Sequence, residues 1–165
     1  IGRPSCDTSS SAGSSSGSSA RDSGAVTISL GTHDLAAAYI NGPGALAIDK
    51  VKGLSFDLAI QGAGTMGIDD AQVDLLKVGM SGAASTRIAG RAAKLTATVR
   101  GTSSLDAESL ATKDAVIGAE GPALVRASVS GTAKVDALGL ASVALVGRPS
   151  CETKTQGSAT VSGCR

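Results

Sequence analysis

Aromatic residues are almost absent from this sequence. It has one Phe, one Tyr and no Trp among 165 residues, although 42% of the chain is hydrophobic. Globular cores usually contain several aromatic rings, so we predict a thin core built from Ala, Val, Leu and Ile. The 22 glycines are too many for a helical bundle and lack the collagen period of three. The composition therefore predicts one domain with many tight turns.

No charge of one sign dominates the chain. It carries 15 Lys and Arg against 14 Asp and Glu, for a net charge of +1. Without a basic run or rings that stack on bases, nucleic acid is not an expected partner. No stretch reaches the roughly 18 to 20 apolar residues that cross a bilayer, so no membrane span is predicted.

The sequence has three cysteines, Cys6, Cys151 and Cys164. The last two enclose a short tail rich in Ser, Thr and Gly, and we expect a disulfide between them. Such a bond indicates an oxidising, extracytoplasmic location: the periplasm, the outer surface or the medium. The alternative is that the three thiols are unrelated.

A Ser-rich stretch separates the N-terminus from the rest of the chain. Residues 7–23 read DTSSSAGSSSGSSARDS, which offers too little apolar surface to offset the entropy of ordering. We therefore predict a Ser/Gly-rich N-terminal segment over residues 1–24, and a folded domain with a Cys-bracketed tail over residues 25–165.

Beyond this segment, glycines repeat at a nearly constant interval. Their spacings are 20, 20, 19 and 20 residues, and Ala141 takes the next place. A period of this length is typical of solenoids. The repeating glycines are Gly42, Gly62, Gly82, Gly101 and Gly121.

Apolar residues recur in the register of the glycines and form five columns. The first column is Val26, Leu46, Met66, Leu105, Val125 and Leu145, interrupted by Thr86, and the second is Ile28, Ile48, Ile68, Ile88, Ala107 and Ala127. The other three are Phe56, Leu76, Leu95, Ala115 and Val135; Leu58, Val78, Ala97, Ile117 and Ala137; and Ile60, Met80, Val99 and Ala119.

Within each unit the columns lie two residues apart, which is the period of a β-strand. We expect a short strand around residues 45–49, a turn near Lys52 and Gly53, and a longer strand around 54–60. One unit alone can bury nothing, but units stacked at about 4.8 Å turn each column into a continuous aliphatic ladder. The sequence thus predicts an all-β solenoid of about seven rungs, with glycines at corners that require a positive φ.

The repeat INGPGALAIDKVKGLSFDLAIQGAGTMGID (residues 40–69), the segment Gly147–Cys151 and the turn at Gly157 and Ser158 carry a resemblance. They resemble the head GIN domain, the auto-transporter adhesin family of bacterial envelope proteins. The resemblance implies a right-handed, single-stranded β-helix, generally behind a secretion signal, and supplies no catalytic residues. The chain departs from the usual Gly-Ser-Gly by having GPG, GAG, GAA and GTS at the corners.

Two strings match enzyme motifs without the required context. Residues 62–67 read GAGTMG, the GxGxxG of dinucleotide folds, but no helical pattern follows and the first glycine recurs in every rung. Residues 13–17 read GSSSG, the GxSxG of hydrolases, but no apolar strand precedes them. We interpret both as coincidental.

Other chemical groups are sparse. His33 is the only histidine, and a solvated loop position is the simplest reading of it. Four carboxylates resemble glycosidase pairs or calcium ligands, but no calcium-binding repeat is present, so solvated strand ends are expected. The sequence predicts no enzyme, metal or cofactor. These carboxylates are Asp49, Asp69, Asp70 and Asp74.

The two ends of the chain share a short sequence. IGRPSCDT at residues 1–8 matches VGRPSCET at residues 146–153, and open solenoid ends invite stacking by another copy. We hypothesise end-to-end assembly with Cys6 in an intermolecular contact; internal duplication without assembly is the equal alternative. The expected function is a non-enzymatic, adhesin-like structural module that forms oligomers or filaments. A surface glycan-binding module is the second hypothesis and a carbohydrate-active enzyme the third.

Overall fold

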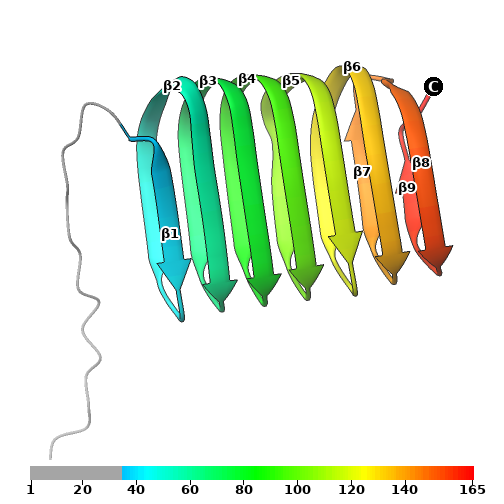
Figure 1. The fold of residues 1–165 in the computed structure, drawn as a ribbon, viewed down its shortest axis with the longest axis horizontal. Coiled ribbons are helices and arrows are strands. Elements are labelled where there is room, and N and C mark those ends of the chain that lie inside the picture. The colour runs from blue at the N-terminus through cyan, green and yellow to red at the C-terminus, as the bar shows by residue number, and fades with distance from the viewer. Residues whose placement is uncertain (1–34) are drawn as a thin grey trace, which may run out of the picture. The chain divides into compact units, whose positions relative to one another are not determined.

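The computed structural model describes residues 35–165, which form parallel β-strands and contain no helix (Figure 1). The N-terminal segment and the residues Cys6, Val26, Ile28 and His33 lie outside this range. Within it, no helix is long and apolar enough to cross a membrane. The strands are β1 (Ala37–Asn41), β2 (Ala45–Gly62), β3 (Thr65–Gly82), β4 (Ser85–Gly101), β5 (Ser104–Glu120), β6 (Leu124–Gly139), β7 (Ser142–Val146), β8 (Ser150–Gly157) and β9 (Thr160–Ser162).

Each strand pairs with the equivalent part of the next turn of the chain. Leu46 pairs with Met66 and Ile48 with Ile68, so the predicted solenoid is confirmed. The described residues form about six turns, slightly fewer than the seven expected. The corners of successive turns are glycines with positive φ: Gly42, Gly62, Gly82, Gly101, Gly121, Gly139 and Gly157.

Most turns of the solenoid consist of one long strand that bends around a corner. β2 runs without a break for 18 residues, so the turn expected near Lys52 and Gly53 is wrong. The bend is instead absorbed by irregular pairing, for example between Ile68 and Ala71 where β3 meets β4. Gly90 at this bulge has a φ of +126°, and a Cβ there would lie 2.2 Å from the carbonyl oxygen of Ala71, so the position requires glycine.

The core is a single narrow stack of apolar, mostly aliphatic side chains. Phe56, Leu76 and Leu95 are fully buried and occupy the same position on successive rungs, as their column predicted. Thr86 stands between Met66 and Leu105 in the first column, and its buried hydroxyl has no hydrogen-bond partner among the described residues.

The last rungs are shorter than the repeat predicted. Gly139, not Ala141, follows Gly121 in the corner column. The backbone N–H of Gly121 donates to the carbonyl of Leu138, the residue before Gly139; Gly42 bonds in the same way to Gln61, the residue before Gly62. The pairing of β5 and β6 shifts after Ala107 and again after Thr112. These shifts shorten the turn from 20 residues to 18.

The shortening moves three columns by two residues, so their predicted final members are wrong. Val125 pairs with Val143 rather than Leu145. Ala133 replaces Val135 opposite Ala115, and Val135 replaces Ala137 opposite Ile117. The core remains apolar here, because Ala133, Val135 and Ala137 are all buried in the positions that they occupy.

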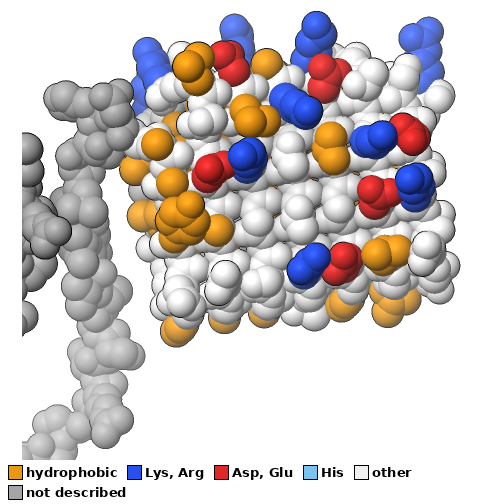
Figure 2. Space-filling view, viewed as in Figure 1, with side chains coloured by type: hydrophobic (Ala, Val, Ile, Leu, Met, Phe, Trp, Pro, Cys, Tyr) orange, Lys and Arg blue, Asp and Glu red, His pale blue; other side chains and the backbone are white. Residues whose placement is uncertain are grey.

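Oppositely charged side chains face each other across neighbouring rungs, as the space-filling view shows (Figure 2). All of these groups are exposed, so each pair contributes at most about 1 kcal/mol. Their effect is to favour the observed register over a slipped one. The pairs are Lys50–Asp70 at 3.3 Å, Lys77–Asp57 at 3.9 Å, Arg100–Glu120 at 3.1 Å, Arg126–Glu108 at 3.8 Å and Lys134–Glu152 at 3.2 Å.

Candidate functional site

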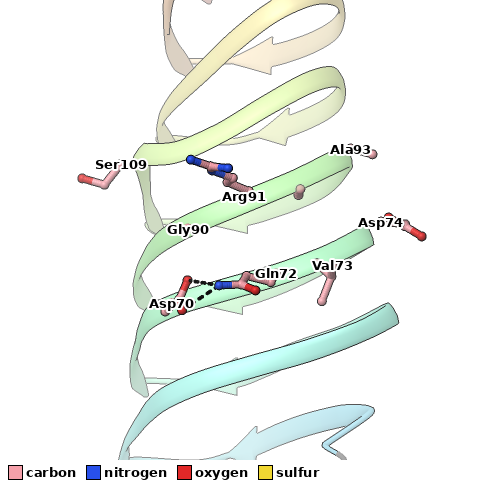
Figure 3. A pocket seen from close by; sticks show the side chains of 9 residues that line it. Asp70, Gln72, Val73, Asp74, Gly90, Arg91, Ala93 and Ser109 are labelled. Carbon is pink, nitrogen blue, oxygen red and sulfur yellow. Dashed lines mark hydrogen bonds between the residues drawn. The ribbon is translucent and has the colours of Figure 1, made fainter.

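A shallow hollow opens on the outside of the bulged corner between β3, β4 and β5 (Figure 3). It has a volume of about 800 Å³. It lies at the bulge where the pairing of β3 with β4 shifts register after Ile68. Its polar lining comes from Asp70, Gln72, Asp74, Arg91 and Ser109.

Hydrogen bonds fix the acidic side of the hollow. The side-chain N–H of Gln72 donates to both carboxylate oxygens of Asp70, at 3.0 and 3.3 Å. The ammonium of Lys50 lies 3.3 Å from the same carboxylate. Arg91 extends into the hollow from the next rung (Figure 3). A carboxylate, an amide and a guanidinium in one depression provide hydrogen-bond donors and acceptors for a polar ligand.

The carboxylates singled out in the sequence do not form one site. Only Asp70 and Asp74 line the hollow, while Asp49 and Asp69 are exposed elsewhere on the surface. Over residues 35–165 no group of three or more His, Cys, Asp or Glu side chains is placed to hold a metal ion. Residues 62–67 lie at a corner and the start of β3, which is not the context of a nucleotide-binding loop. Residues 13–17 fall outside the described range.

Asp114 has a structural role at the shortened corner. Its Oδ1 atom accepts a hydrogen bond from the hydroxyl of Thr132 at 2.6 Å and another from the Thr132 backbone N–H at 3.2 Å. These bonds, the hydroxyl bond first, stabilise the charged carboxylate and hold the pKa of Asp114 below its ordinary value. Asp114 therefore links β5 to β6, the first strand of the shortened part.

The C-terminal end of the solenoid presents open strand edges. β8 pairs only with β6, and β9 only with β7. Among the described residues nothing pairs with their other edges. The interior-facing side chains of β8 here include Thr153 and Thr155, which are exposed, whereas Val135 in the rung before is fully buried.

The direction of the backbone groups at this edge follows from the register. The Asp57 N–H donates to the carbonyl of Ala36 at 3.0 Å, so residues at this position bond to the preceding rung. Glu152 holds the same position in the last rung. Alternate residues of a parallel strand bond to opposite neighbours. The N–H and C=O of Thr153 and Thr155 therefore point out of the open edge.

A disulfide joins Cys151 at the start of β8 to Cys164 just after β9, with 5.6 Å between the Cα atoms. The backbone N–H of Arg165 also donates to the carbonyl of Pro149 at 3.1 Å. In the other rungs the chain continues into a further turn at this point. Here the disulfide closes the last rung on itself.

Sequence reasoning did not identify the hollow, and it predicted open solenoid ends without placing them on β8 and β9. Gln72 and Arg91 belong to no motif, and only their outward position in the repeat could have indicated that they face the same corner. The position of the edge follows from the number of rungs, of which the described residues form about six.

These features define a parallel β-solenoid with polar outer faces, open terminal strands and a disulfide-closed last rung. The sequence model of the family described as "Putative auto-transporter adhesin, head GIN domain" matches residues 9–149. The chain belongs to this adhesin-like family. No curated protein and no solved structure matches it.

Proposed function

We propose that this chain is a non-enzymatic, extracytoplasmic structural module that self-assembles end to end. The observation that carries the proposal is the open edge of β8, eight residues long, at the C-terminal end. Unpaired strand edges template pairing with another chain unless they are covered. Membership of the adhesin-like family and the Cys151–Cys164 bond support a location outside the cytoplasm.

The opposite end of the described solenoid supports the same proposal. Leu46 lies in the first interior column but is 36% exposed, whereas Met66 and Leu105 in that column are 4% and 0% exposed. Within residues 35–165 no strand covers this side of Leu46. A strand added there would bury apolar surface, at a gain of about 25 cal/mol per Å².

An inward-facing charge at the C-terminal edge tests the proposal. Thr153→Lys should leave the monomer folded, because the side chain is exposed there, but should block stacking, which would bury the ammonium. We expect association to weaken at least tenfold in sedimentation velocity, and fibres or oligomers to disappear from electron micrographs. The matched control is Thr98→Lys, the same substitution at an exposed position of β4, away from both ends of the described solenoid. A native chain that stays monomeric at high concentration would refute the proposal.

The hollow at the bulged corner favours a second candidate, recognition of surface glycans. Carboxylate, amide and guanidinium groups such as Asp70, Gln72 and Arg91 hydrogen-bond sugar hydroxyls. If this candidate holds, an array of surface oligosaccharides should show binding that Arg91→Ala weakens about tenfold. Arg126→Ala, an arginine outside the hollow, should bind like the native chain. An array without signal would remove this candidate.

A further inference from the structure

The open C-terminal edge resembles the rung that begins the described solenoid. β8, the corner Gly157 and β9 are arranged like β1, the corner Gly42 and the first residues of β2. We propose that the partner of the C-terminal edge is the N-terminal edge of a second copy, aligned so that Gly157 faces Gly42. This inference rests on the proposed self-assembly and specifies its surface and register.

The backbones of the two edges are complementary. Tyr39 pairs with Ala59, two residues after the Ala37–Asp57 pair, so its N–H and C=O point away from β2. Thr153 and Thr155 direct theirs out of β8. With Tyr39 opposite Lys154, the N–H and C=O of Tyr39 face the C=O of Thr153 and the N–H of Thr155. This is the parallel hydrogen-bond pattern found between all neighbouring rungs. The interface would therefore continue the existing sheet.

The outer side chains of the two edges are also compatible in this register. Lys154 lies opposite Tyr39, whose ring is 72% exposed and can accept the ammonium or its aliphatic stem. Gln156 lies opposite Asn41, where two amides can exchange hydrogen bonds. Glu152 meets the neutral Ala37, so no like charges are opposed.

The interior side chains match as well. Val161, partly buried against the core, lies opposite Leu46, the apolar residue exposed at the other end. Thr155 meets the half-buried Ile40, which its methyl group can contact. Ala159 meets Gly44, as small residues meet throughout this column. Stacking thus continues the aliphatic ladder, whose first described member is Leu46.

This contact joins two different surfaces and leaves both outer ends free. Such a heterologous interface produces an open, polar filament, whereas an isologous contact between two β8 strands would close as a dimer. The described β1 edge and the β8 edge lie at opposite ends of the strand order, so each added copy presents the same edge again.

A charge-swap experiment in the full chain tests the register. Tyr39→Lys places two ammonium groups opposite each other and should weaken association at least tenfold in sedimentation velocity. Lys154→Glu in the same chain should restore it by creating an ion pair. The matched control is Tyr39→Lys with Gln156→Glu, which adds the same charge two residues away and should restore little. Both altered positions are exposed, and circular dichroism checks that each variant is folded.

The outcomes separate this inference from the proposed function. Native chains that never associate would overturn both. Native association that Tyr39→Lys leaves unchanged would overturn the register alone, and would indicate that another segment of the same chain covers β1. Closed dimers in place of filaments, or equal rescue by Gln156→Glu, would likewise overturn it.

Discussion

Replacing Gly82 by Ala should destabilise the solenoid by about 2–5 kcal/mol, combining backbone strain with steric overlap. Gly82 has a φ of +100°, and a Cβ there would lie 2.6 Å from the carbonyl oxygen of Gly62 in the rung below. Neither backbone can move freely, because both belong to ladders that continue in each direction. The free energy of unfolding from urea titration, followed by circular dichroism, measures the loss.

Gly67→Ala is the matched control for this substitution. Gly67 lies in the same strand, no atom lies within 4 Å of the position of its Cβ, and its φ is not positive. The change should be neutral or stabilise by about 0.4–1 kcal/mol, because Ala restricts the unfolded chain. Equal destabilisation by both substitutions would show that the corner conformation does not limit stability.

Removing the disulfide should have the second large effect, confined to the C-terminal end. Closing a loop with the 13-residue separation of Cys151 and Cys164 stabilises by about 3 kcal/mol. β9 depends strongly on it, because its three residues pair with β7 alone. In a solenoid each rung contacts only its neighbours, so the ends can open without the middle.

Hydrogen exchange measures this effect when Cys151→Ser/Cys164→Ser is compared with the chain that keeps the disulfide. Amides of β9 should exchange on the order of 100-fold faster, while those around Val125 in β6 should change little. Cys6→Ser belongs in both chains, so that the remaining thiol cannot form new bonds. Faster exchange throughout would contradict a local role for the disulfide, and unchanged exchange in β9 would show that the pairing with β7 suffices.

The solenoid was predictable because two independent periods agree in this sequence. The glycine spacing places corners near Gly62 and Gly82, and alternation at period two places residues such as Leu76 and Leu95 inside. The last rungs were not predictable in the same way. There the two-residue shortening falls at the register shifts after Ala107 and Thr112. Buried residues alternate with exposed ones in β6 on both sides of these shifts, so the apolar pattern does not reveal the shorter rung.

The candidate site was predictable only in its covalent part. Cys151 and Cys164 enclose a short tail, which sufficed to predict their bond. The hollow lies at the bulge between Ile68 and Ala71, where consecutive buried residues of β3 are three positions apart instead of two. A break of this kind indicates a bend but not a hollow. The outward side chains near this bend, such as Arg91, belong to no motif. The sequence therefore does not predict which of them lie beside one another.

The scarcity of aromatic residues has a practical consequence for optical measurements. The chain has no Trp, so Tyr39, its only tyrosine, is the only residue with useful intrinsic fluorescence. Tyr39 lies on β1, the first described strand. Its emission therefore reports on the β1 extremity of the described solenoid. A fluorescence transition that precedes the circular dichroism transition would signal fraying of that extremity, and quenching on concentration would signal its occlusion.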